Sequence, residues 1–192
     1  MTEKAVSSTE DFDAIVIGSG ATGGWATKEL CERGLKTLVL DRGRMVEHIV
    51  DYDTDNKGKH ELTYRGDWPP RKQQEYRLSP TARPENYPFY ASDTEHPYVF
   101  DEEKPFIWVR PNIVGGKSIV WGRHCYRWSE QDFRANKVDG HGLDWPVRYN
   151  DIEPWYSHVE KVVGISGESL GLAQLPDSEF QPPMPMNILE KE

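Results

Sequence analysis

The stretch "FDAIVIGSGATGGWATKELCERGLKTLVLDRG", residues 12 to 43, places a glycine cluster between two short apolar runs. Gly18, Gly20 and Gly23 fit the pattern G-x-G-x-x-G, and the second apolar run ends on Asp41. Glycines where a strand meets a helix indicate that something large and negatively charged approaches the backbone there.

The apolar runs predict a fully buried strand over 14–17 and a second strand over 36–40. Between them, the sequence predicts a helix over 23–33 that turns Ala26 and Leu30 inward. Such a β-α-β unit has parallel strands and a right-handed crossover. The predicted fold class is therefore α/β, a Rossmann-like domain with a parallel sheet.

Each residue of the glycine pattern has a physical role in binding a dinucleotide. Gly18 permits the tight turn, Gly20 removes a side chain where a pyrophosphate approaches, and Gly23 lets helix and strand pack closely. Asp41 follows Gly20 by 21 positions, where an acid accepts hydrogen bonds from an adenosine ribose. The helix N-terminus adds N–H donors. These features fit NAD as well as FAD.

The composition limits the partners of the 192-residue chain. The net charge of -9 argues against nucleic acid and anionic membranes, which would repel the protein. Cys31 and Cys125 lie far apart without a further Cys or His cluster, so no disulfide framework and no metal site are expected. The mean hydropathy of -0.75 is low for a chain that must build its own core.

Outside the glycine-rich unit, the patterns vary along the chain. Residues 1–11 predict a flexible tail without an export signal, so the location is cytoplasmic by default. Residues 51–105 predict an irregular, proline-rich insertion, and 106–109 predict a strand-like run. No segment is long and apolar enough to span a membrane.

The stretch "DWPVRYNDIEPWYSHVEKVVG", residues 144 to 164, predicts an amphipathic helix. Asn150 or Asp151 is expected to cap it, Pro154 to lie in its first turn and Gly164 to end it. Its apolar stripe is expected to face the core, and it consists of Ile152, Trp155, Tyr156, Val159 and Val163.

These motifs, together with "GGKSIVWG" at residues 115–122, resemble the N-terminal portion of the glucose-methanol-choline (GMC) oxidoreductases. The nearest branch contains gluconate dehydrogenase flavoproteins and pyranose oxidases. The resemblance covers most of residues 12–187 and is weakest in the insertion. It implies that the cofactor is FAD and that the reaction oxidises an alcohol or sugar hydroxyl.

Carried over by residue, the resemblance implies that the first β-α-β turn binds the adenosine half of FAD. Gly18, Ser19, Gly20 and Gly23 would hold the pyrophosphate. Asp41, which is Glu in many members, would hold the ribose, and Arg42 could flank it. The segment expected beside the flavin consists of Gly115, Gly116, Lys117, Ser118, Trp121 and Gly122.

Departures from the family limit the expected chemistry. Some relatives carry a histidine in this loop that bonds covalently to the flavin, and here Ser118, Ile119 and Val120 occupy the loop. FAD is therefore expected to be non-covalent, with His124 a surface or structural residue. Five tryptophans are expected to fill core rather than bind substrate: Trp108, Trp121, Trp128, Trp145 and Trp155.

Several functional hypotheses remain open. The main one is the N-terminal FAD-binding part of an alcohol or sugar oxidoreductase in which a base deprotonates the hydroxyl and flavin takes the hydride. In GMC enzymes that base is a histidine near the C-terminus, so no catalytic residue is assigned here and the chain alone is expected to be inactive, with its substrate domain absent. A non-catalytic assembly module and an NAD-dependent dehydrogenase are the alternatives. The electron acceptor is undefined, and export with a partner subunit stays open.

Overall fold

The computed structural model describes residues 10–52 and 57–191. The chain forms two compact units, Met1–Trp121 and Gly122–Glu192. Residues 1–9 of the predicted tail 1–11 lie outside the described residues.

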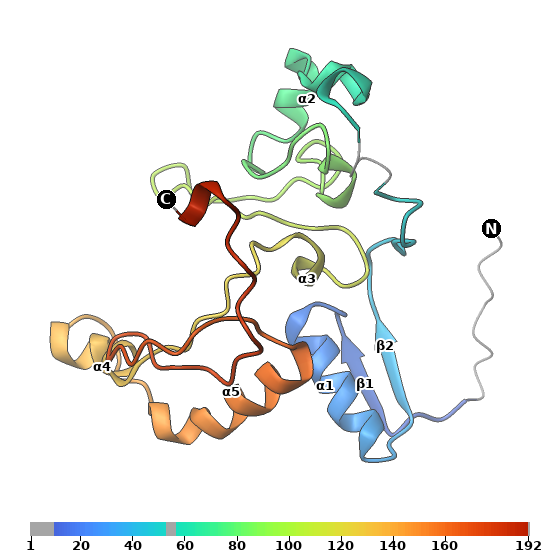
Figure 1. Ribbon diagram of the computed structural model, residues 1–192. Helices are drawn as coiled ribbons and strands as arrows, with labels where there is room; N and C mark the ends of the chain where they lie inside the picture. The colour runs from blue at the N-terminus through green and yellow to red at the C-terminus, as the bar shows by residue number, and fades with distance from the viewer. Residues whose placement is uncertain (1–9, 53–56, 192) are drawn as a thin grey trace. The chain divides into compact units, whose positions relative to one another are not determined.

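The first unit opens with a β-α-β unit. It consists of β1 (Ala14–Ile17), α1 (Ala21–Glu32) and β2 (Thr37–Leu40), with α1 beside the two strands (Figure 1). The strands pair in parallel, so the predicted order and direction of these elements are confirmed. The helix begins earlier than predicted because Gly20, in an extended conformation, takes the N-cap position.

The prediction that β1 is fully buried is wrong. Val16 faces α1, because its Cγ1 atom lies 3.4 Å from the point where a Cβ of Gly23 would be. Ile15 and Ile17 alternate to the opposite face, where they are 62% and 86% exposed. Ala26, predicted on the inner face of α1, is exposed as well. A two-stranded sheet with one helix covers only one of its faces.

The hydrophobic core of the first unit lies mainly in the segment predicted as an irregular insertion. This segment holds short helices: η1 (Lys59–Glu61), η2 (Thr63–Gly66), α2 (Pro70–Glu75) and η3 (Tyr87–Phe89). The buried cluster consists of Tyr76, Ala82, Phe89, Tyr90 and Ile113. Trp68 packs against it, with its ring centroid 5.4 Å from that of Tyr76. The predicted insertion therefore contributes most of the buried side chains of this unit, although it contains only short helices.

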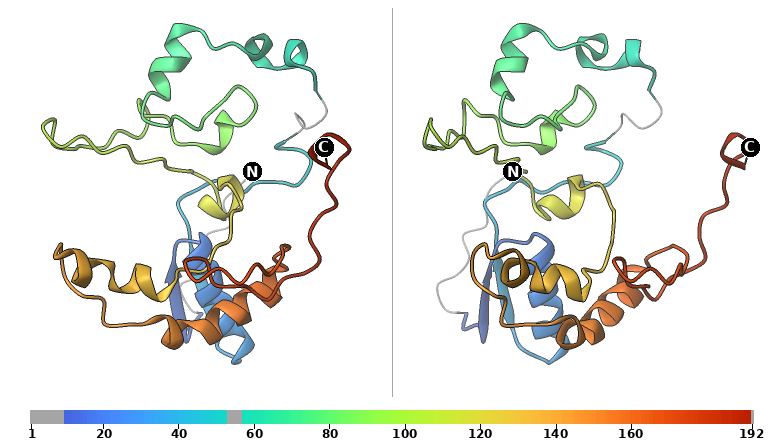
Figure 2. Two further views of the ribbon diagram at one scale, coloured as in Figure 1. Left: turned by 60° about the vertical axis from the view of Figure 1, so that its left-hand side comes forward. Right: turned by 90° about the vertical axis from the view of Figure 1, so that its left-hand side faces the viewer.

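The run 106–109 is not a strand, contrary to the sequence-based expectation. The chain doubles back around residues 98–108 and forms the yellow-green arm in Figure 2. The hydroxyl of Tyr98 holds this arm, since it donates to the carbonyl of Phe106 and accepts from the N–H of Trp108, both at 2.8 Å. A side chain thus replaces the backbone ladder that a strand would have provided.

The second unit contains α4 (Glu130–Asp139), α5 (Tyr149–Val163) and η4 (Leu189–Lys191). The amphipathic helix was predicted in the right place, but its cap was not. Arg148 takes the N-cap position, and the carboxylate of Asp151 accepts the Arg148 N–H at 2.8 Å. Pro154 consequently lies inside α5 rather than in its first turn.

The apolar stripe of α5 is only partly buried. Trp155 and Val163 are 61% and 51% exposed, and the one buried residue of the helix is Glu160. The expectation that five tryptophans fill core is wrong for all of them, since each is at least 41% exposed: Trp108, Trp121, Trp128, Trp145 and Trp155.

A buried ion pair holds α5 to the chain that precedes α4. Arg127 donates to both carboxylate oxygens of Glu160, at 2.8 and 2.6 Å, and to the hydroxyls of Tyr149 and Ser157, each at 3.0 Å. The backbone N–H of Glu179 also donates to Glu160. Burial by itself raises the pKa of Glu160, but these hydrogen bonds outweigh it and hold that pKa below its ordinary value. Sequence patterns gave no sign of this pair.

Candidate dinucleotide site

The glycine turn joins β1 to α1 in the first unit. Gly18 has a positive φ of 89°, a conformation that glycine adopts without strain, and its N–H donates to the carbonyl of Leu40 at 2.7 Å. Gly20 ends the turn as the N-cap of the twelve-residue α1. The free N–H groups at the start of this helix and its dipole favour an anion at this end.

Gly20 and Gly23 have different surroundings, as their predicted roles require. A Cβ on Gly23 would lie 1.9 Å from the carbonyl oxygen of Gly18, so only glycine lets α1 approach the turn. A Cβ on Gly20 would meet nothing within 4 Å. The second glycine therefore borders open space at the helix N-terminus, which is the room that a phosphate needs.

Asp41 lies one residue beyond β2 and is tied to the turn. Its Oδ2 atom accepts the N–H of Ser19 at 2.8 Å and the Ser19 hydroxyl at 2.5 Å, and its Oδ1 atom accepts the N–H of Gly43 at 2.7 Å. The Ser19 hydroxyl, followed by the Gly43 N–H, holds the pKa of Asp41 below its ordinary value. Asp41 is therefore ionised at neutral pH.

The second glycine segment lies directly against the first. The N–H of Gly115 donates to the Ser19 hydroxyl at 2.8 Å, and a Cβ on Gly116 would lie 3.3 Å from the Cα of Gly20. The hydroxyl of Ser118, in the short helix α3 (Lys117–Val120), donates to the carbonyl of Gly115 at 2.6 Å. The structure thus brings together two motifs that are almost a hundred residues apart in sequence.

The remaining predicted site residues are less closely associated with the turn. The side chains of Arg42, Lys117 and Trp121 are exposed, and Arg42 contributes its backbone N–H to the Asp41 carboxylate. Gly122 is the first residue of the second unit. The predicted role of Arg42 beside the ribose and those of the other three residues beside the flavin stay predictions.

Gly43 also contributes to the site, although it was not among the predicted site residues. A Cβ there would lie 2.5 Å from the backbone N and C atoms of Ile113, so the chain after β2 crosses residue 113 at backbone contact. Arg44 continues this contact, since its N–H donates to Asn112 and its carbonyl accepts from Val114. The available signal was a glycine placed two residues after the acid in "DRG".

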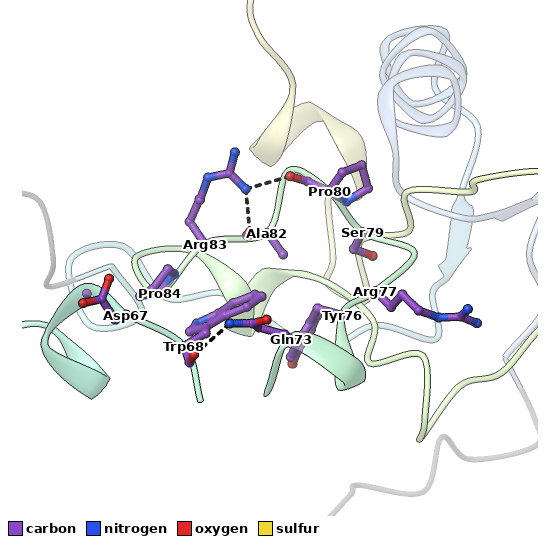
Figure 3. A pocket seen from close by; sticks show the side chains of 11 residues that line it. Asp67, Trp68, Gln73, Tyr76, Arg77, Ser79, Pro80, Ala82, Arg83 and Pro84 are labelled. Atoms are coloured by element: carbon purple, nitrogen blue, oxygen red, sulfur yellow. Dashed lines mark hydrogen bonds between the residues drawn. The ribbon is translucent and has the colours of Figure 1, made fainter. Parts of the chain in front are cut away.

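A separate shallow cavity of about 320 Å³ lies within residues 66–84 (Figure 3). Its lining includes Trp68, Gln73, Arg77 and Arg83. Gln73 donates to the carbonyl of Trp68 at 3.0 Å, and Arg83 donates to the carbonyls of Pro80 and Ala82, so these polar groups serve the local chain. The cavity does not include the glycine turn.

Within residues 10–52 and 57–191, no group of three or more His, Cys, Asp or Glu side chains is placed to hold a metal ion. Cys31 and Cys125 are free thiols. His124 is exposed and stacks beside Tyr126, with ring centroids 6.0 Å apart. No helix in the described part of the chain has the length and apolar character needed to cross a bilayer.

Comparison with curated proteins shows what kind of protein the chain resembles. It is 32% identical over 166 residues to the 2-methyl-1,2-propanediol dehydrogenase of Mycolicibacterium austroafricanum, a match that covers 83% of this chain and 26% of that enzyme. It is 26% identical over 190 residues to the fructose dehydrogenase large subunit of Gluconobacter japonicus, covering 94% and 32%. No protein-family model matches the chain.

The chain is therefore related to dehydrogenases and oxidases. Its relatives include the gluconate 2-dehydrogenase flavoprotein of Pantoea cypripedii, 28% identical over 169 residues and matched over 82% of this chain and 26% of that protein. The predicted resemblance to the gluconate dehydrogenase branch is thereby confirmed. The chain spans about a quarter to a third of the length of these three relatives.

Proposed function

We propose that the chain is the N-terminal FAD-binding part of a GMC-type oxidoreductase, which as a complete protein oxidises an alcohol or sugar hydroxyl. The observation that carries this proposal is the open space beside Gly20, at the N-terminus of α1 and next to the ionised Asp41. The names of the relatives support the reaction class and the flavin.

The residues present fit the adenosine half of a dinucleotide. In this proposal, the N–H groups of Gly20 and of the first turn of α1 donate to the pyrophosphate, and Asp41 accepts from the ribose hydroxyls. Asp41 already accepts from the Ser19 hydroxyl and from the N–H groups of Ser19, Gly43 and Arg42, so in this proposal a ribose hydroxyl shares or replaces one of these donors. When bound, flavin supplies the acceptor for a hydride.

The chain's own role is binding and orientation. The glycine loop beyond Ile113 would lie along the cofactor past its phosphates, where the missing side chains at Gly115 and Gly116 permit close approach. Attachment is non-covalent in this proposal, because no histidine occurs from residue 115 to 122. The base that takes the substrate proton is proposed to lie outside this chain.

Titration of the purified chain with FAD, with NAD as comparison, tests the proposal. Gly20→Val should weaken FAD binding by about tenfold or more, because its methyl groups fill the space that the phosphates need. Asp41→Ala should weaken binding less than Gly20→Val, since it leaves the phosphate space open, although it removes the ribose acceptor and the hydrogen bonds to Ser19 and Gly43. Gly24→Ala is the matched control, because a Cβ there meets only the Ser19 carbonyl at 3.6 Å.

Three results would contradict the proposal. Unchanged FAD affinity in Gly20→Val would show that the phosphates do not bind beside Gly20. Tighter binding of NAD than of FAD would show that NAD is the cofactor. Flavin that remains with the pellet after acid precipitation of the loaded chain would show covalent attachment.

A further inference from the structure

The hydroxyl of Ser19 joins three segments of the first unit. It donates to Oδ2 of Asp41 at 2.5 Å and accepts the N–H of Gly115 at 2.8 Å. The direction of both bonds is fixed, because a carboxylate can only accept and a backbone N–H can only donate. A serine hydroxyl can donate one hydrogen bond and accept another at the same time, and an apolar side chain can do neither.

Asp41 holds the same loop through a second route. Its Oδ1 atom accepts the N–H of Gly43, and Gly43 lies in backbone contact with Ile113. Ile113 is 2% exposed and belongs to the hydrophobic core of the unit. The acid therefore supports the glycine loop at residue 113 through Gly43 and at residue 115 through Ser19.

We infer that Ser19 is a positioning residue, which holds the glycine loop of residues 113–118 against the glycine turn by bridging Asp41 and Gly115. The loop forms the wall that a bound dinucleotide meets beyond its phosphates, so Ser19 sets the position of that wall. The claim that Ser19 sets the position of this wall rests on the proposed function, whereas the bridge between Asp41 and Gly115 does not.

The amide of Gly115 reports on the bridge without any ligand. In Ser19→Ala, this partly buried N–H loses its acceptor, and a donor left unpaired is unfavourable, so the loop should open more often. Hydrogen exchange of the Gly115 amide, followed by NMR after glycine-selective 15N labelling, should accelerate about tenfold. Ser19→Thr keeps the hydroxyl and should restore slow exchange.

Two further variants separate this role from a general loss of stability. Thr27→Ala removes another hydroxyl of the same β-α-β unit, one that donates to the carbonyl of Gly23, and should leave Gly115 exchange unchanged. Asp41→Asn should accelerate exchange of the Gly115 amide. An asparagine side chain has one acceptor oxygen and one donor NH2 group, so it cannot accept from both Ser19 and Gly43 as the two carboxylate oxygens do. Equal Gly115 exchange in wild type and Ser19→Ala would overturn the inference.

A ligand experiment tests the position of the wall. After loading with FAD, Ser19→Ala should change the visible circular dichroism of the bound flavin, and Ser19→Thr should restore it. An unchanged flavin signal in Ser19→Ala would contradict the claim about the wall. If the wild-type chain binds no FAD, the proposed function fails, and the exchange rates alone decide whether the bridge exists.

Discussion

Neighbouring glycines in α1 should respond in opposite ways to the same substitution. Gly23→Ala would place a methyl group 1.9 Å from the backbone oxygen of Gly18, which cannot move away without distorting the turn. Overpacking of this kind lowers the free energy of unfolding by about 1–3 kcal/mol. Gly24→Ala meets only ordinary contact and should raise it by about 0.5–1 kcal/mol, because alanine favours the helix. Urea denaturation of both variants measures the difference, and equal effects would refute the close packing at Gly23.

Asp41 should make stability depend on acid pH. Its pKa in the folded chain lies below the ordinary value of 3.8, so the ionised form stabilises the fold above that value. This contribution is lost as the pH falls through about 3.8 toward the lower pKa of the folded state. Between pH 6 and pH 3, Asp41→Asn should therefore lose less free energy of unfolding than the wild type. Parallel pH profiles for the two proteins in urea titrations would contradict this.

At the scale of elements, the ion pair between Arg127 and Glu160 should anchor α5. Glu160→Gln removes the carboxylate that is hydrogen-bonded to the 4% exposed guanidinium and leaves only the half-exposed Glu153, at 3.8 Å, as its charged partner, which should lower the free energy of unfolding by about 3–5 kcal/mol. Lys161→Ala removes the adjacent exposed pair with Glu179, at 2.7 Å, and should cost at most about 1 kcal/mol. Thermal and urea denaturation compare the two. Similar losses in both variants would show that burial does not strengthen the first pair.

Elements were predictable where the signal was local. The glycine pattern and the flanking apolar runs predicted β1, α1 and β2 in the right order. The periodicity of residues 149–163 predicted α5 but not its start, because Asp151 acts on the Arg148 N–H rather than as the cap itself. Burial was harder to predict, since a pattern of isoleucines in β1 cannot show whether both sheet faces are covered.

The contacts that assemble the candidate site were not predictable. Both glycine segments could be recognised separately, each by its own motif. Their connection depends on single hydrogen bonds and one backbone contact, namely those of Ser19 with Gly115 and of Gly43 with Ile113. Such pairs have no periodicity, so a single sequence contains no signal that they meet.

For the whole molecule, we predict that the FAD-loaded chain does not oxidise alcohols or sugars faster than free FAD. A general base must lie beside the reacting hydroxyl, and all six histidines of the chain are exposed: His48, His60, His96, His124, His141 and His158. The assay uses a panel of sugars and alcohols with a dye as electron acceptor. Turnover above the free-FAD rate that is lost on substitution of one of these histidines would contradict the prediction.

The bond between Ser19 and Gly115 also bears on the order of folding during synthesis. The ribosome completes β1, α1 and β2 well before it reaches the glycine loop, since the two residues are 96 positions apart. Closing so long a loop has an entropic cost, and contacts of this range form slowly. Until then the nascent chain carries an ionised Asp41 and an incomplete turn. We therefore expect the glycine turn to stay without its Gly115 partner until residue 115 has been synthesised and has left the ribosome.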